Sequence, residues 1–178
     1  MRRIYTSYAS LFLVSGAVIA LDQWTKWLVR ENIPFAQQWL PQWLEWLMPY
    51  ARFVHWSNTG AAFGMFQGGS LLFTILAFVV IALIIYYYPQ VPAEDWFLRL
   101  ALAMQMGGAA GNLISRLSMD GKVTDFISVG SFPVFNVADS SISIGVAVLL
   151  VGMWMKERKM RPEAMAKSNL GESDSPGT

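Results

Sequence analysis

The stretch LLFTILAFVVIALIIYYY at residues 71–88 is an unbroken apolar run that points to a membrane protein. Apart from one threonine and three terminal tyrosines it has no polar side chain. A hydrocarbon core of about 30 Å is crossed by around 20 helical residues. Residues 4–21, 96–114 and 137–155 are apolar runs of similar length. The sequence therefore predicts an all-α membrane protein with four transmembrane helices.

Composition agrees with one membrane domain, predicted over residues 1–166, followed by a disordered tail over 167–178. The chain has 178 residues, of which 54% are hydrophobic and 14% charged. A formal net charge of only +1 and the absence of a basic block outside the tail argue against nucleic-acid binding. With no cysteine and only His55, disulfides, thiol chemistry and imidazole-rich metal centres are excluded, and we expect no cofactor.

Basic residues at the two ends of the chain predict the topology. An even number of spans places both termini on one side, and the positive-inside rule makes that side cytoplasmic. The residues that carry the rule are Arg2, Arg3, Lys156, Arg158, Lys159, Arg161 and Lys167. Segments 22–69 and 115–136 then face the outer side of the membrane.

The outer segment 22–69 is expected to lie on the membrane surface. It holds six of the eight tryptophans, a residue that prefers the headgroup region: Trp24, Trp27, Trp39, Trp43, Trp46 and Trp56. Tryptophan and leucine recur at helical spacing between Pro34 and Pro49, which predicts a short interfacial helix. The aromatic and β-branched run 51–57 predicts a strand, with residues 58–60 as its turn. A small β element on the outer face is therefore expected.

Two aspartates at the edges of apolar segments are the main candidates for functional residues: Asp125 in VTDF and Asp139 in FNVADS. An ionised aspartate near hydrocarbon costs roughly 2.5–3.5 kcal/mol, so both are expected to be functional. The predicted topology puts both on the outer side, where they can meet. Two carboxyl groups in contact share a proton, so one can take a proton from water while the other polarises a carbonyl. Such a pair titrates as a unit, and neither residue is assigned as acid or base.

The sequence contains few residues that would support another catalytic mechanism or another function. The chain has no zinc-peptidase helix motif, no serine–histidine pair and no phosphate-binding loop. Ser115, Ser118 and Lys122 could form a serine–lysine pair, although their spacing does not require it. A small proton-coupled transporter is a second hypothesis, weakened because both aspartates lie toward one face. A catalytically inactive membrane scaffold is a third.

Polar residues near the predicted span ends form short clusters. Asp22 and Lys26 are four apart, so their side chains can meet on one helix face. Asn112 and Arg116 share a face in the same way at the outer end of the third span. Gly107 and Gly111 form a small-xxx-small pattern that is typical of close helix packing.

Five motifs, taken together and in this order, resemble the lipoprotein signal peptidases, also called signal peptidase II, which are bacterial membrane aspartic endopeptidases. The motifs are Asp22-x-x-x-Lys26, Asn58-x-Gly60-x-Ala-Phe, Gly107-Gly108-x-x-Gly-Asn112 with Arg116, Val-x-Asp125-Phe, and Phe-Asn136-x-Ala-Asp139.

The resemblance implies that Asp125 and Asp139 are the catalytic dyad. Asn58, Asn112, Arg116 and Asn136 would hold the substrate or the dyad, and Asp22, Lys26, Gly60 and Gly108 would give structural support. It also implies a partner: a prolipoprotein whose cysteine carries diacylglycerol, cleaved before that cysteine at the outer face of the bacterial cytoplasmic (inner) membrane. Membrane lipid would surround an enzyme that we expect to be a monomer.

One position departs from the pattern that the resemblance implies. The family usually has Asp before the arginine, where this chain has Ser115. This departure leaves Arg116 without its customary charge partner, so its orientation is the least determined feature of the expected site.

Overall fold

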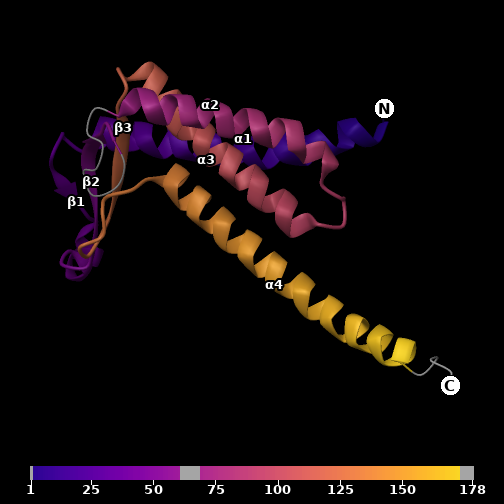
Figure 1. Cartoon of the computed structure of the whole chain (residues 1–178). Coiled ribbons are helices and arrows are strands. Elements are labelled where there is room, and N and C mark those ends of the chain that lie inside the picture. Colours follow the sequence, from indigo (N-terminus) through magenta and orange to yellow (C-terminus); the bar gives the residue numbers. More distant parts are fainter. Residues whose placement is uncertain (1, 61–68, 173–178) are drawn as a thin grey trace, which may run out of the picture.

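The computed structural model describes residues 2–60 and 69–172. Its helices in chain order are α1 (Arg2–Asn32), the 3-10 helix η1 (Gln42–Leu47), α2 (Ser70–Tyr87), the 3-10 helix η3 (Tyr88–Gln90), α3 (Trp96–Ser118) and α4 (Val137–Glu172). The strands are β1 (Gln38–Trp39), β2 (Ala51–Asn58) and β3 (Val123–Val129). The small sheet lies at one end of the helices, opposite the N-terminus and the far end of α4 (Figure 1).

Two helical stretches in the described residues are long and apolar enough to cross a membrane, Ser70–Gln90 and Val137–Arg158. The other two long helices, α1 and α3, carry buried polar side chains, among them Ser15, Lys26 and Ser115. These groups face neighbouring protein and lower the mean hydropathy of their helices. The membrane character of the chain is thus clear, while the spans assigned to α1 and α3 stay a prediction.

Helix α3 is the centre of the bundle and packs against α1, α2 and α4. Its glycines allow this close approach. A Cβ on Gly107 would lie 2.7 Å from the Cβ of Val18 on α1, and one on Gly108 would lie 2.5 Å from the carbonyl oxygen of Ala138 on α4. Neighbouring backbone thus occupies the space that a side chain at Gly108 would need, which explains glycine there.

The buried apolar core is formed where α1, α2 with η3, and α3 meet. Its members are Leu11, Ile84, Tyr88, Ala103 and Met106. The opposite side of α2 is apolar and exposed, as on a helix that faces lipid: Leu71, Leu72, Ile75, Phe78 and Val79.

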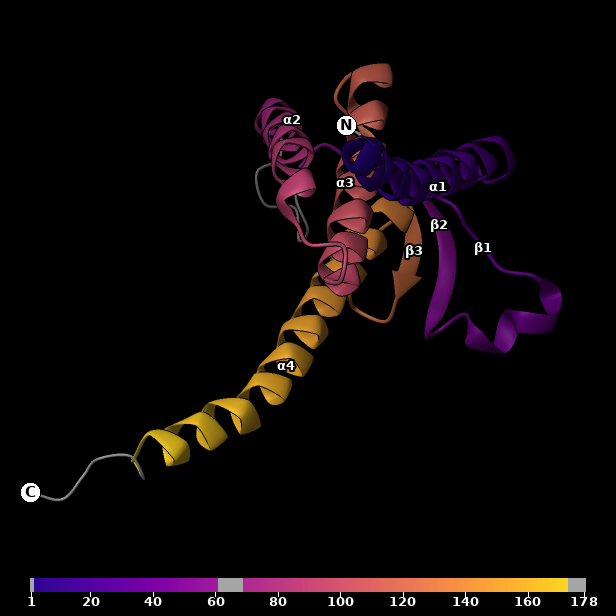
Figure 2. The same cartoon turned by 90° about the vertical axis from the view of Figure 1, so that its right-hand side faces the viewer.

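The sheet is antiparallel in the order β1-β2-β3, with β2 in the centre. The strand predicted over 51–57 is confirmed as β2. Trp56 pairs with Asp125 and Asn58 with Val123, and the register shifts between Phe53 and Trp56. Figure 2 shows β2 and β3 side by side beneath α1. This pairing places Asp125 beside the ends of α3 and α4 that lie at the sheet.

Two long helices, α1 and α4, extend beyond their predicted bounds. Helix α1 continues to Asn32 instead of ending near residue 21, because no proline or glycine interrupts it before Pro34. Helix α4 runs to Glu172 and so includes part of the tail expected to be disordered over 167–178; residues 173–178 lie outside the described residues.

The expected interfacial helix is a 3-10 helix, η1, of six residues, without a buried side chain. Pro41 directly before it and Pro49 shortly after it leave too little chain for a longer helix. Trp43 and Trp46 are 76% and 69% exposed, which suits the interfacial position expected for this segment.

Candidate active site

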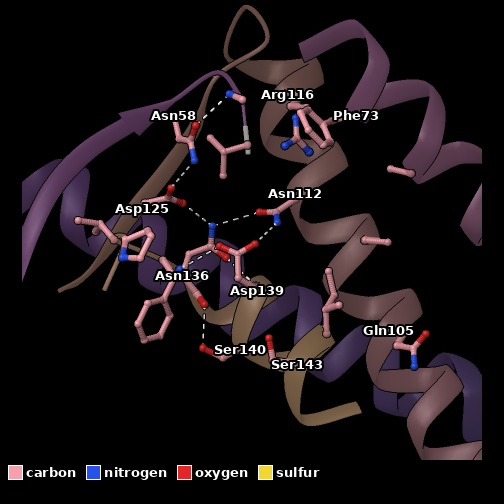
Figure 3. A pocket seen from close by; sticks show the side chains of 18 of the residues that line it. Asn58, Phe73, Gln105, Asn112, Arg116, Asp125, Asn136, Asp139, Ser140 and Ser143 are labelled. Atoms are coloured by element: carbon pink, nitrogen blue, oxygen red, sulfur yellow. Dashed lines mark hydrogen bonds between the residues drawn. The ribbon is translucent and has the colours of Figure 1, made fainter. Parts of the chain in front are cut away.

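A cavity of about 810 Å³ lies where the sheet meets α2, α3 and α4. Both aspartates line it, as do four of the other residues expected at the site: Asn58, Asn112, Arg116 and Asn136 (Figure 3). The fold therefore brings all six together from β2, α3, β3 and the start of α4.

Asp125 is held on β3 by two amide side chains. It is 2% exposed. Its Oδ2 accepts a hydrogen bond from Nδ2 of Asn58 at 3.0 Å, and its Oδ1 accepts one from Nδ2 of Asn136 at 2.7 Å. The backbone N–H of Gly60 donates to Oδ1 of Asn58 at 2.9 Å, which leaves the amide nitrogen of Asn58 for the carboxylate. The turn at 58–60 thus orients a donor toward Asp125.

Asp139 lies in the first turn of α4 and forms a reciprocal cap with Asn136. The N–H of Asp139 donates to Oδ1 of Asn136 at 3.0 Å, and the N–H of Asn136 donates to Oδ2 of Asp139 at 3.2 Å. These are the two bonds of a capping box, with aspartate in the place more often taken by glutamate. The remaining oxygen, Oδ1, accepts from Nδ2 of Asn112 at 2.8 Å. The helix start therefore fixes the orientation of this carboxylate.

Burial, together with the neighbouring charge of Asp139, raises the pKa of Asp125 to about 6, although the hydrogen bonds from Asn58 and Asn136 oppose the shift. A buried carboxyl beside a second carboxylate holds its proton more firmly than one in water. The two groups can therefore exist with one proton between them near neutral pH.

Arg116 projects from α3 into the same cavity. Its guanidinium lies over the ring of Phe73, 5.5 Å from the ring centroid, and its Nε is buried with no hydrogen-bond partner among the described residues. Both Asp125 and Asp139 lie within reach of its charge. A buried N–H without a partner is available to a substrate oxygen.

A buried ion pair lies behind the aspartates. Lys26 and Asp22, both fully buried, meet at 2.8 Å, as their spacing predicts. Oδ1 of Asp22 accepts from the N–H of Ala138 at 3.0 Å, and Nζ of Lys26 donates to Oδ1 of Asn112 at 2.9 Å. The pair thus touches α3 and α4 directly beneath the site.

Residues 14–155 match the protein family described as signal peptidase (SPase) II. The chain belongs to the signal peptidase II family. The expectation drawn from its motifs is confirmed, and the chain is a membrane peptidase, a hydrolase of this family.

Curated relatives of similar length support the assignment. A lipoprotein signal peptidase of Halalkalibacterium halodurans is 36% identical over 159 residues, which cover 87% of this chain and 98% of the relative. That of Listeria monocytogenes is 36% identical, covering 84% of this chain and 96% of the relative, and that of Shouchella clausii is 37% identical, covering 83% and 94%.

Two solved structures described as bacterial membrane enzymes share the fold. One superimposes with a TM-score of 0.72 at 24% identity, covering 96% of this chain and 95% of its own. The other gives a TM-score of 0.71 at 26% identity, covering 82% and 92%.

The position at which this signal peptidase II departs from the family's usual motif faces away from Arg116. Ser115 is 1% exposed, and its Oγ lies 3.3 Å from both Nζ of Lys26 and Nε2 of Gln23. Its hydroxyl donates to the carbonyl of Gly111 at 3.2 Å. The serine therefore contacts the Lys26 side of the Asp22–Lys26 pair, whereas Arg116 packs over Phe73.

The geometry also weakens the serine–lysine alternative. The hydroxyl of Ser115 is enclosed by the buried ion pair, and that of Ser118 bonds to the carbonyls of Ile114 and Ser115. Lys122 is exposed. In the described residues, neither serine has a hydrogen bond to Lys122.

Sequence reasoning missed Gln23 and Phe73, and it missed the capping box. Gln23, which lies at the ion pair behind the site, donates to the carbonyl of Gly111 on α3 at 2.9 Å, and Phe73 supports Arg116. The capping box has a readable signal, because Asn136 stands three residues before Asp139 at the start of an apolar run. Gln23 and Phe73 have no comparable signal, since their contacts join separate helices.

Proposed function

We propose that this enzyme removes the signal peptide of diacylglyceryl-modified prolipoproteins, with Asp125 and Asp139 as its catalytic dyad. The observation that carries the proposal is the bridge made by Asn136, whose side chain and backbone bond to both carboxylates. Two carboxyl groups joined through one residue and open to one cavity are suited to hydrolysing a peptide bond.

The reaction would follow from the shared proton. The ionised aspartate takes a proton from a water molecule as its oxygen attacks the carbonyl carbon, and the protonated aspartate donates to the carbonyl oxygen. The tetrahedral intermediate then collapses: the C–N bond breaks, the leaving nitrogen takes the proton that the dyad received from water, and one hydroxyl of the intermediate returns its proton to the other aspartate. The dyad returns to one proton, and no individual role is assigned to either residue.

The walls of the cavity suit a lipid-anchored peptide. Apolar side chains of α2 and α4 line its sides, including Leu76, Val80 and Ile142, whereas Asn58 and Arg116 stand near the aspartates. A signal peptide and acyl chains would contact the apolar walls. Arg116 would donate its free Nε–H to a carbonyl or ester oxygen of the substrate.

We further propose that both termini are cytoplasmic and that the dyad lies on the outer face of the bacterial inner membrane. The support is the basic residues near both ends and the exposed tryptophans of the sheet end, Trp39, Trp43, Trp46 and Trp56. There a membrane-tethered substrate reaches the dyad by lateral diffusion.

Cleavage of a lipidated prolipoprotein by purified enzyme, followed by a gel shift, tests the proposal. Wild type is expected to cleave it, Asp125→Asn and Asp139→Asn to lose activity, and a nonlipidated precursor to be cut poorly. Wild-type activity in either variant would refute the dyad, and equal cleavage of both precursors would refute the lipid requirement.

An inactive scaffold would show no cleavage by wild type. The departure at Ser115 does not favour this alternative, because the residue contacts Lys26 and Gln23 instead of the dyad or Arg116. The transporter alternative has no observation in its favour in the described part of the chain.

A further inference from the structure

The ammonium group of Lys26 is fully buried and fully satisfied. Its three protons meet three acceptors: Oδ2 of Asp22 at 2.8 Å, Oδ1 of Asn112 at 2.9 Å and Oγ of Ser115 at 3.3 Å. An ammonium can only donate hydrogen bonds. Whatever faces it must therefore present an acceptor.

This requirement decides which way the amide of Asn112 points. Its Oδ1 faces Lys26, so its Nδ2 faces Oδ1 of Asp139 at 2.8 Å. The flipped amide would place its NH2 group against the ammonium and its oxygen against the carboxylate, which are two repulsive contacts. Within the described residues, Lys26 has no hydrogen bond to Asp125 or Asp139. It nevertheless determines that the NH2 group of Asn112, and not its oxygen, faces Asp139.

The same choice extends to Asn136. Oδ1 of Asn112 also accepts from Nδ2 of Asn136 at 3.2 Å, and that nitrogen donates to Oδ1 of Asp125 at 2.7 Å. A flipped Asn112 would turn its NH2 group toward this nitrogen. The orientation that Lys26 imposes on Asn112 therefore determines which groups donate to both carboxylates. Figure 3 shows the bonds that join Asn112 and Asn136 to Asp125 and Asp139.

We propose that Lys26 is a positioning residue that acts through Asn112, orienting the amides of Asn112 and Asn136 so that both donate to the dyad. The inference rests on the proposed function only in taking Asp125 and Asp139 as the reacting pair. It gives the buried ion pair a role in hydrolysis besides its contribution to packing.

The charged groups around the dyad come from four elements: Asp22 and Lys26 from α1, Arg116 from α3, Asp125 from β3 and Asp139 from α4. Replacing Lys26 by methionine keeps the apolar stem of the side chain, one atom shorter, and removes both its charge and its donors. Gln23 provides a matched control, since it donates to Asp22, to Ser115 and to the carbonyl of Gly111.

A double-mutant cycle between Lys26→Met and Asn112→Ala is the test, with kcat and KM measured on lipidated prolipoprotein. We expect Lys26→Met to lower kcat about 10- to 100-fold with KM nearly unchanged, the scale of one bond to a charged group. When Asn112 is already alanine, adding Lys26→Met should lower kcat by less than about threefold. Gln23→Leu should keep kcat within about twofold. Equal losses from Lys26→Met in both backgrounds, or a loss from Gln23→Leu equal to that from Lys26→Met, would overturn the proposal.

A second readout does not depend on cleavage. The infrared band of the protonated dyad, assigned by its loss in Asp125→Asn, should titrate about one pH unit higher in Lys26→Met. An unchanged midpoint would overturn the proposal. If the midpoint moves while wild type fails to cleave prolipoprotein, the proposed function is wrong and the positioning role stands. If Lys26→Met does not fold, Asp22→Asn/Lys26→Met avoids an unpaired buried carboxylate and is measured in the same two ways.

Discussion

Asn136 donates from Nδ2 to Oδ1 of Asp125 at 2.7 Å while its Oδ1 accepts the N–H of Asp139 at 3.0 Å. One asparagine side chain thus joins a strand residue to the first turn of a helix. This relationship sets the distance between the two carboxylates and makes Asn136 the residue on which their geometry depends.

Asn136→Ala should therefore reduce both activity and stability. The variant loses the helix cap, worth about 0.5–2 kcal/mol, and a bond to a charged acceptor, worth about 1.5–3 kcal/mol. We expect kcat to fall at least about 100-fold and the melting temperature in detergent to drop. Ser118→Ala is the control, since Ser118 is exposed and bonds only to backbone carbonyls. An active Asn136→Ala enzyme would contradict this account of the dyad.

The stability of the protein should depend on pH through Asp125. Its pKa is raised from 3.8 to about 6, so between these values the folded protein holds a proton that the unfolded chain has released. The free energy of unfolding then falls as pH rises through this window, by on the order of 2–3 kcal/mol. Above the window Asp125 is ionised in both states and adds no further change.

Melting curves between pH 4 and 8 would measure this dependence. Asp125→Asn should flatten the fall, because asparagine does not titrate. Asp120→Asn, at an exposed turn position, should leave it as in wild type. A wild-type protein whose stability rises between pH 4 and 6 would contradict the raised pKa.

Arg116→Met should weaken substrate binding more than it affects folding. The variant keeps an apolar side chain beside Phe73 and removes the buried, unpartnered Nε–H of a residue that lines the cavity. We expect KM for lipidated prolipoprotein to rise about 10-fold and the melting temperature to change little. Arg30→Met is the comparison, since Arg30 reaches only Thr124 at 3.4 Å and does not line the cavity. Equal KM values for the two variants would remove Arg116 from the substrate site.

Gly108→Ala should destabilise the helix bundle. The new methyl group would lie 2.5 Å from the carbonyl oxygen of Ala138, so α3 and α4 would have to move apart at a cost of about 1–3 kcal/mol. Gly16→Ala is the matched control, because no atom lies within 4 Å of its Cβ position and alanine favours a helix. Thermal unfolding of both variants in detergent compares them, and equal melting temperatures would contradict the tight α3–α4 contact.

Several features follow from local sequence alone, because they depend on neighbours along the chain. The apolar run that contains α2 predicts its helix, and the four-residue spacing of Asp22 and Lys26 predicts their ion pair. The aromatic and β-branched residues of 51–57 predict β2. Periodicity and spacing carry such information without any long-range contact.

Boundaries were less well predicted, since the end of a helix depends on what it packs against. Helix α1 extends to Asn32, because its last turns pack against the sheet and bury Val29 with Phe126. Hydropathy alone ends this segment at its first charged residue, Asp22, which in the folded protein is buried and paired with Lys26.

The sequence by itself determined the membrane class, the family and the two aspartates, because apolar length and ordered motifs are properties of the chain. Only the tertiary structure decided that Ser115 faces Lys26, that Phe73 supports Arg116 and that Asn136 joins the two carboxylates. These contacts cross between elements far apart in sequence. These contacts depend on the register of the strands and on the close packing of helices at glycines. Neither can be predicted from the local sequence pattern.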